Sequence, residues 1–358
     1  IRPTAINKAN RLPKQEPSRA QGKMRGAFTR LATSIIIMTI VALPSPSAFQ
    51  LKSESIVNSA YLITHYIENR GNSERKDKDG PVTLFIHGLD SSSRTWRGVQ
   101  QALHTPSIAL DCRGCGRSEL GDPGEFAPDA LVADVKSLVV AHPLLRDTPF
   151  VLCGHSMGGR VAMCYAAQHP EDVAALVIED MDIRRRSVQS HPMQNFDWER
   201  AIAFSRRQDT LDSVKEELKS IGYPEHMYSK WIDEGRIYKD SSDGKPGSDV
   251  FLDEDNSGGE FWSDVNPAFR ALCYRTFFDS DAGTDAWSAI ARQLQQQGKG
   301  GGMAVSLMVA GLGTVCDADS IEDMRRVMSG AREGAALSAD GKNWEGSPLT
   351  IKTYAQGT

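Results

Sequence analysis

The chain contains one serine whose neighbours are typical of a catalytic nucleophile. Ser156 lies in the run Gly154-His-Ser-Met-Gly158, which follows an apolar stretch of strand length at residues 150–153 and precedes a helical pattern that stops at Pro170. In this strand–turn–helix context the spacing forces the serine onto a sharp turn and exposes its hydroxyl. The glycines are required because side chains would clash in so tight a bend. The arrangement predicts covalent catalysis, in which an adjacent base deprotonates the serine during attack.

The segments around this serine alternate between strand and helix patterns. Strands are expected at residues 60–70, 82–86, 107–111, 150–153, 174–180, 305–311 and 349–354, and helices at 128–140, 157–169 and 319–329. Such alternation is typical of βαβ units and a parallel sheet. Residues 183–299 differ, because polar helices around 197–219 and 224–235 precede a polar loop at 240–259. We therefore expect a core in two parts, 55–182 and 300–358, interrupted by an inserted cap.

Three motifs follow consecutive predicted strands. They are His87-Gly88, Asp111-x-Arg113-Gly114-x-Gly116-x-Ser118 and Gly154-x-Ser156-x-Gly158. In this order and spacing the chain resembles the α/β-hydrolase superfamily, most closely the small esterases and mitochondrial-type hydrolases whose first loop reads His-Gly-Leu. The resemblance covers about residues 60–182 and 300–358. It implies a mostly parallel α/β-hydrolase sheet with helices on both faces and an inserted, mainly helical cap.

The same resemblance implies two backbone donors for an oxyanion hole. Acyl transfer places negative charge on the former carbonyl oxygen, which must face such donors. In this fold they are the N–H of the residue after the nucleophile, here Met157, and an N–H of the His-Gly-Leu loop, here that of Leu89. We expect His87 to be a structural residue of that loop. We also expect Arg113 to pair with a nearby carboxylate.

The acid of a triad has two candidates and the base has none. In the relatives that look closest, the strand after the serine ends in one Asp, which matches Asp180; Asp317 is the runner-up, and Asp182 is expected to be a solvated loop residue. The family order Ser, Asp, His places the base after the last strand. None of the eight histidines lies there. We therefore expect a fragment that ends short of its base; a pseudo-enzyme or a substituting cap histidine are the alternatives.

Composition excludes several function classes. The net charge of −5 gives no electrostatic reason to expect binding to nucleic acid. Six cysteines in 358 residues do not form a disulfide scaffold. Cys112 and Cys115 have C-x-x-C spacing, but no second pair completes a zinc site, and Cys153 is expected to be a core residue. Because no metal, nucleotide or flavin motif is present, we expect no cofactor.

The amino-terminal residues resemble a targeting segment. Residues 1–23 are basic and carry no structural pattern, whereas residues 24–48 combine arginines, an apolar run at 31–43 and small residues ahead of Phe49. These are the parts of a signal peptide, and the run is shorter than the ~20 residues of a membrane span. We expect a route into the secretory pathway or a plastid. The alternative is an uncleaved signal anchor that contacts the membrane through residues 31–43.

The residues together predict a serine hydrolase that cleaves a carboxylic ester, thioester or lipid acyl bond of a small molecule through an acyl-enzyme on Ser156. Haloalkane dehalogenases and epoxide hydrolases carry an Asp at this turn, so the serine argues against both. Serine-dependent C–C bond hydrolases and haloperoxidase-like enzymes stay open. The alternative class is a non-catalytic ligand-binding protein of the same fold, and without a base the chain is expected to show almost no turnover. Trp262 and Asn266 either line the acyl pocket or pack within the cap.

Overall fold

The computed structural model describes residues 51–58, 62–70, 80–240, 260–297, 303–310, 315–329, 336–337, 344–345 and 349–354. The extension 1–23, the predicted targeting segment 24–48 and residues 241–259 of the predicted cap loop lie outside these ranges. Within these ranges none of the helices combines the length and the apolar character needed to cross a bilayer.

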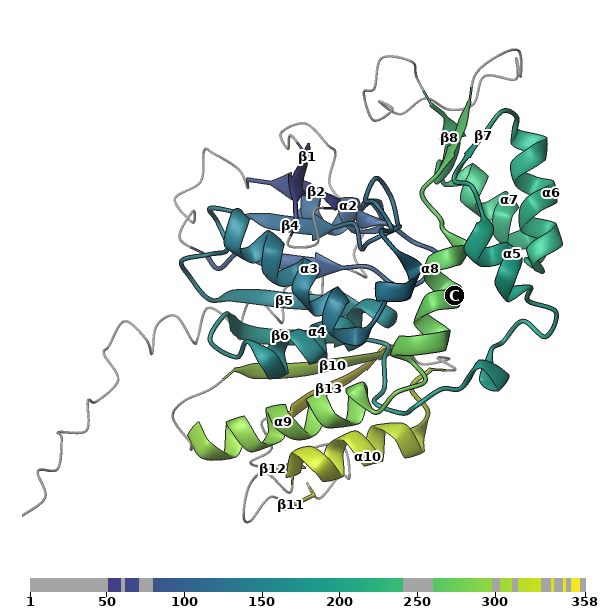
Figure 1. The fold of residues 1–358 in the computed structure, drawn as a ribbon. Coiled ribbons are helices and arrows are strands. Elements are labelled where there is room, and N and C mark those ends of the chain that lie inside the picture. The colour runs from purple at the N-terminus through teal and green to yellow at the C-terminus, as the bar shows by residue number, and fades with distance from the viewer. Residues whose placement is uncertain are drawn as a thin grey trace, which may run out of the picture.

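Eight of the described strands form one sheet at the centre of the fold (Figure 1). In the order in which they lie side by side, they are β1 (Leu51–Val57), β2 (Ile63–Asn69), β4 (Ser107–Leu110), β3 (Thr83–Ile86), β5 (Phe150–His155), β6 (Val173–Glu179), β10 (Ala304–Ala310) and β13 (Leu349–Tyr354). β2 runs antiparallel to both β1 and β4, and every other neighbouring pair is parallel. The predicted mostly parallel α/β sheet is confirmed.

Both faces of the sheet are buried, which is why its central strands read as continuous apolar runs. Along β3, Leu84 and Ile86 face one core, whereas Phe85 faces the other. The first core is covered by α3 (Pro128–Ala141), α4 (Met157–Gln168) and α9 (Ala282–Gln297), with α10 (Ala318–Ser329) beside α9. The second core is covered by η1 (Ser93–Trp96) and α2 (Arg97–Ala102). The short η2 (Pro123–Glu125) precedes α3.

The cap lies beyond the carboxyl ends of the parallel strands, and Figure 1 shows it at the right of the sheet. Its elements are η3 (Val188–Ser190), α5 (Trp198–Ala203), α6 (Leu211–Ile221), α7 (Glu225–Asp233), α8 (Pro267–Leu272), the π-helical turn η4 (Cys273–Phe277) and a small antiparallel sheet of β7 (Arg207–Gln208), β9 (Phe261–Ser263) and β8 (Ile237–Lys239). The cap has a hydrophobic core of its own. The remaining short strands are β11 (Ala336–Leu337) and β12 (Trp344–Glu345).

Three features of the secondary structure and domain organisation differ from those predicted. The single helix expected at residues 197–219 is two helices, because Thr210 caps α6 by accepting the N–H of Ser213. Helix α9 lies within the range predicted as the cap, 183–299, yet it packs against α4 and buries its apolar side in the sheet core. Strand β1 was not expected, because four of its seven residues are polar and its apolar residues do not alternate with them.

Candidate active site

Ser156 occupies a strained turn between β5 and α4. Its φ of 51° and ψ of −122° place it in a region that residues with a side chain rarely adopt. The neighbouring glycines permit this turn: a Cβ on Gly154 would clash with the backbone of Gly158, and one on Gly158 would clash with the carbonyl group of Ile86. The backbone N–H of Ser156 donates to the carbonyl oxygen of Glu179 at 2.8 Å. The predicted strand–turn–helix geometry is therefore present.

The loop after β3 lies directly against this turn. A Cβ built on Gly88 would come within 3.1 Å of Ser156 Cβ and 2.9 Å of His155 Nδ1. Leu89 follows Gly88, and Met157 is the first residue of α4, where helix geometry leaves the N–H without an intrahelical partner. No hydrogen bond within the described ranges uses the backbone N–H of Leu89 or Met157. Two free donors thus come from the two segments that meet at the serine.

His87 is buried and holds this loop in place. Its Nδ1 lies 2.7 Å from the carbonyl oxygen of Gly88, and its Nε2 lies 3.1 Å from the backbone N of Cys112. A carbonyl can only accept and an amide N–H can only donate, so the ring is neutral with its proton on Nδ1. Burial lowers the pKa of His87, which favours the same neutral form. His87 has the structural role that we expected.

Asp180 reaches the same edge of the sheet as Ser156, because the adjacent strands β5 and β6 pair His155 with Glu179. Its φ is 49°, and its backbone N–H donates to Met308 of β10 at 2.8 Å. Within the described part of the chain its buried Oδ1 has no hydrogen-bond partner. Burial raises the pKa of the Asp180 carboxyl, and His155 acts in the opposite direction. A buried carboxylate oxygen without a partner is suited to accept a hydrogen bond from an N–H or O–H group.

Asp317, the runner-up acid, is the N-terminal cap of α10. Its Oδ1 accepts the backbone N–H of Ser320 at 2.7 Å, and its Oδ2 accepts from Arg184 at 3.0 Å. The hydrogen bond from Ser320 lowers the pKa of the Asp317 carboxyl. The side chain is 58% exposed, and both of its oxygens already have partners. The geometry therefore favours Asp180 over Asp317.

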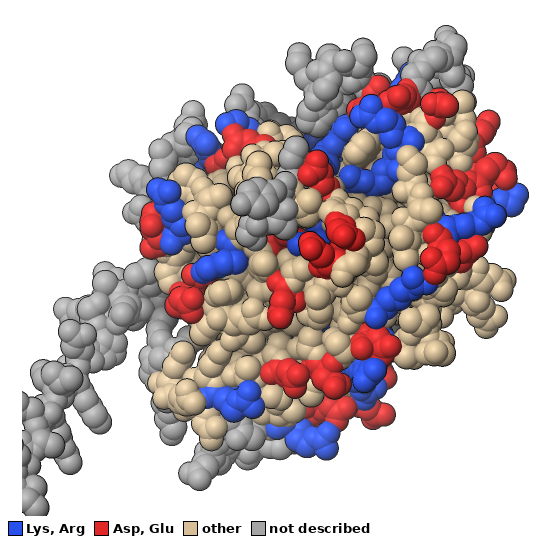
Figure 2. Space-filling view, in the orientation of Figure 1, with Lys and Arg blue, Asp and Glu red and all other residues tan. Residues whose placement is uncertain are grey.

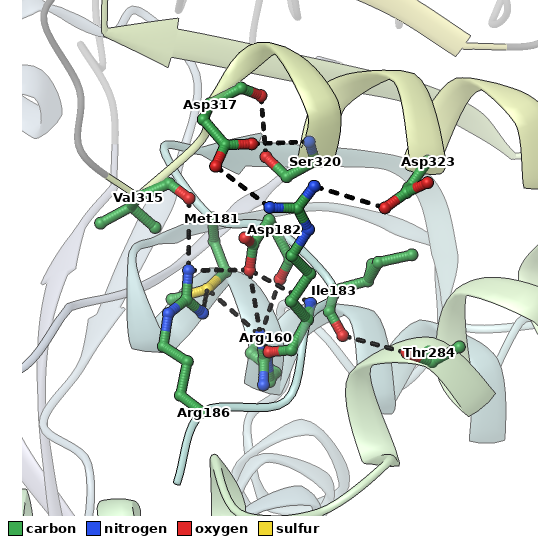
Figure 3. A network of polar contacts seen from close by, with 11 residues as sticks. Arg160, Met181, Asp182, Ile183, Arg186, Thr284, Val315, Asp317, Ser320 and Asp323 are labelled. Carbon is green, nitrogen blue, oxygen red and sulfur yellow. Dashed lines mark hydrogen bonds and ion pairs between the residues drawn. The ribbon is translucent and has the colours of Figure 1, made fainter. Parts of the chain in front are cut away.

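The prediction that Asp182 is a solvated loop residue is wrong. Only 2% of its surface is exposed, and its Oδ1 accepts from Arg160 at 3.3 Å and from Arg186 at 2.8 Å (Figure 3). The sequence of a charged loop is the same whether its side chains are exposed to solvent or buried, so it does not predict their burial. The two arginines that neutralise Asp182 come from α4 and from later in the same loop, and this pairing was not visible in the sequence.

Arg160 organises the segment that follows Asp180. The fully buried guanidinium donates through Nη2 to the backbone oxygens of Asp182 at 3.0 Å and Arg184 at 2.7 Å, as well as to the Asp182 carboxylate (Figure 3). Arg186 adds a bond to the carbonyl oxygen of Val315 at 3.2 Å. Sequence reasoning missed Arg160, although it is the single charged residue in the predicted helix 157–169.

None of the described histidine side chains is hydrogen-bonded to Ser156 or Asp180. His191 of the cap has both ring nitrogens engaged, one with Met193 and one with Arg270. His104 and His226 are exposed on the surface. The side chains described here therefore supply no evident base.

Trp262 and Asn266 fasten the cap to the glycine turn after β4. Trp262 donates its Nε1–H to the carbonyl oxygen of Gly116 at 3.0 Å, and Asn266 donates to that of Gly114 at 2.8 Å. Three guanidinium groups lie 4.6 to 5.7 Å from the Trp262 ring, those of Arg117, Arg206 and Arg207. Figure 2 shows basic side chains gathered at the upper right of this face, with acidic ones close by. Trp262 and Asn266 thus both bind the cap to the turn after β4.

Other side chains with possible chemistry have structural roles. Arg113 pairs with Asp134 as expected, with Nη2 2.8 Å from Oδ1. Cys112 and Cys115 are buried free thiols whose pKa values are raised by burial, which keeps them protonated. In the part of the chain that the structure describes, one group has ligand atoms close enough for a metal ion, namely His169, Glu171 and Asp172. One oxygen of this Asp172, Oδ2, already accepts from Tyr165 and Lys136.

Known proteins share this fold and part of this sequence. Residues 81–218 match a family model described as alpha/beta hydrolase fold. Lipase LipV of Mycobacterium tuberculosis is 39% identical over 111 residues, which cover 30% of this chain and 40% of LipV. The sn-1-specific diacylglycerol lipase ABHD11 of Mus musculus is 32% identical over 105 residues, 28% of this chain and 33% of that protein. The matched segments thus span 40% or less of these relatives.

Two solved structures have a similar fold at low identity. The thioesterase domain from the curacin biosynthetic pathway superposes with a TM-score of 0.54 at 14% identity, over 86% of this chain and 94% of that domain. An alpha/beta hydrolase from Novosphingobium aromaticivorans gives 0.51 at 17% identity, over 85% and 90%. Fold and sequence therefore agree that this chain has the α/β-hydrolase fold, with residues 81–218 matching the family model.

Proposed function

We propose that this protein is a serine hydrolase that cleaves a carboxylic ester, thioester or lipid acyl bond through an acyl-enzyme on Ser156. The strained turn carries the proposal: Ser156 holds a φ of 51° at the amino end of α4, between the segments of Leu89 and Met157. Such strain persists where the surroundings over-determine it and is concentrated at functional sites. Two of the relatives, LipV and ABHD11, bear the name lipase, which supports an acyl substrate.

In the proposed reaction, Ser156 Oγ attacks the acyl carbon, its proton passes to a base, and the bond to the alcohol or thiol leaving group breaks. The backbone N–H groups of Leu89 and Met157 would stabilise the oxyanion, and loss of one such donor costs about 3 kcal/mol in known hydrolases. Asp180 would orient the protonated base through its unpaired Oδ1. Water then releases the acid from Ser156. We assign no base among the described residues.

Labelling with a fluorophosphonate probe tests the proposal on the full-length protein. We expect covalent label on Ser156, loss of the label in Ser156→Ala, and retention in Ser190→Ala, a matched change at an exposed serine on η3. Turnover is then compared across a p-nitrophenyl ester, an acyl thioester and a diacylglycerol to identify the bond that is cleaved.

A folded protein that takes no label and hydrolyses none of these substrates would refute the proposal. Binding of the same substrates without turnover would instead support the alternative, a ligand-binding member of the superfamily. The two results are separated by a binding titration, because only the second gives saturable binding.

A further inference from the structure

A buried ion pair joins the cap to the loop that carries Leu89. Asp90 follows Leu89 directly, and only 6% of its surface is exposed. Arg270 of α8 donates through Nε to the two carboxylate oxygens at 3.2 and 3.0 Å, and through Nη2 to Oδ2. A fork of this kind fixes the relative direction of the two groups as well as their separation. Helix α8 is thereby tied to the residue next to the predicted oxyanion donor.

Two further segments of the cap bond to Asp90. Tyr223, between α6 and α7, donates its hydroxyl to Oδ1 at 3.0 Å, and Arg236, between α7 and β8, donates to the backbone oxygen at 3.0 Å. Asp90 has a φ of 50°, which is unfavourable for a residue with a side chain. A strained conformation of this kind is kept only where neighbouring groups determine it. At Asp90 the determining groups come from the cap.

His191 holds the other side of the Arg270 guanidinium. Its Nε2 accepts from Arg270 Nη1 at 3.3 Å, and its Nδ1 lies 3.2 Å from the carbonyl oxygen of Met193. Three aromatic rings surround the imidazole with centroids 4.5 to 5.0 Å away, those of Phe196, Trp198 and Tyr274. The guanidinium of Arg270 is therefore held by His191 of the cap as well as by Asp90.

Resting on the proposed function, we propose that Arg270 is a positioning residue for the oxyanion hole. Through Asp90 it holds the loop so that the Leu89 N–H faces the carbonyl oxygen of the substrate. A donor that is turned away stabilises the transition state less but leaves ground-state binding largely intact. The docked cap then contributes to the chemical step as well as to substrate binding.

Arg270→Met, compared with Arg113→Met, tests this inference in the full-length protein. Both changes remove a buried arginine that makes a two-pronged ion pair, but Arg113 pairs with Asp134 of α3 and makes no hydrogen bond to Asp90. We expect Arg270→Met to lower kcat by about 10²-fold with little change in KM, and Arg113→Met to leave kcat nearly unchanged. Arg270→Lys should recover part of kcat, since it keeps the charge and loses the fork.

Hydrogen exchange of the backbone amides supplies a readout that does not require turnover. The peptide spanning residues 87–93 should exchange faster in Arg270→Met than in Arg113→Met. An unchanged kcat and unchanged exchange in Arg270→Met, or an equal loss of kcat in both variants, would overturn the inference. If Arg270→Met does not fold, Arg270→Lys and Asp90→Asn decide by the same two measurements. A wild-type protein that hydrolyses nothing would refute the proposed function, while the exchange comparison would still test the role of Arg270.

Discussion

Replacing His191 by Gln should remove a component of acid sensitivity from the stability of this protein. Burial, together with the nearby Arg270 guanidinium, lowers the pKa of His191 from 6.5 to about 4. The ring is neutral in the folded protein and takes up a proton more readily in the unfolded chain. Folding is therefore unaffected above the unfolded pKa near 6.5, and stability falls as the pH drops from there toward 4.

The size of the effect follows from the pKa difference. A shift of one unit corresponds to 1.36 kcal/mol, so the full difference of 6.5 to about 4 is worth roughly 3 kcal/mol. At pH 5 only part of this is lost, about 2 kcal/mol of the free energy of unfolding. Gln keeps an oxygen that can accept from Arg270 but does not titrate. His191→Gln should thus lose about 2 kcal/mol less than the wild type between pH 7 and pH 5.

Urea unfolding at pH 7, 6 and 5 measures this difference, provided that the m-value stays constant. Other titrating groups contribute equally in both proteins, so their contributions cancel when the loss measured for His191→Gln is subtracted from that of the wild type. His226→Gln, a matched change at an exposed histidine of α7, should follow the wild type. If His191→Gln and the wild type lose the same stability from pH 7 to pH 5, His191 is not held neutral by its surroundings and the reasoning fails.

Three further outcomes are expected. Asp180→Asn should lower kcat by up to about 10⁴-fold, as loss of a triad acid does elsewhere, whereas Asp317→Asn should leave kcat unchanged; ester hydrolysis by both variants decides between the two acids. Gly158→Ala should cost at least about 2 kcal/mol in the free energy of unfolding, because its Cβ would clash with backbone. Gly235 also has a positive φ, but a Cβ added there has no atom within 4 Å, so Gly235→Ala should cost only about 1 kcal/mol in the free energy of unfolding by the same denaturant assay. Mass spectrometry of the protein from its native cells should find a mature amino terminus near Phe49; an intact residue 24–48 segment would favour the signal anchor.

The turn at Ser156 could be predicted from the sequence because every feature that shapes it is local. An apolar strand, glycines on both sides of the serine and a helix pattern all occur within twenty residues. Asp180 was predicted as a candidate acid from the resemblance to relatives whose corresponding strand ends in one Asp, and its place after an apolar strand agrees with that, since the carboxyl ends of parallel strands share one edge. The parallel sheet itself follows from the alternation of strand and helix patterns.

The cap and its connections could not be predicted in the same way. Helix α9 has an apolar stripe that fits either a cap or a core, and only packing against α4 assigns it to the core. The polar loop after Asp180 gave no sign that Asp182 is buried, because burial depends on Arg160 of another helix. The sequence around a charged residue such as Asp182 does not differ between a buried and a solvent-exposed position.

Local sequence thus determined the fold class and the strained turn at Ser156 of this protein, since these depend on neighbours along the chain, whereas Asp180 was proposed as the acid from the family resemblance. The tertiary structure alone decided that Asp90 pairs with Arg270, a residue 180 positions away, and that the cap is thereby bonded to the loop of Leu89. The physical reason is that the two residues are far apart in the chain, so their ion pair forms only when the cap is docked on the core. Docking also buries both charges and places the other donors, Tyr223 and Arg236, against Asp90.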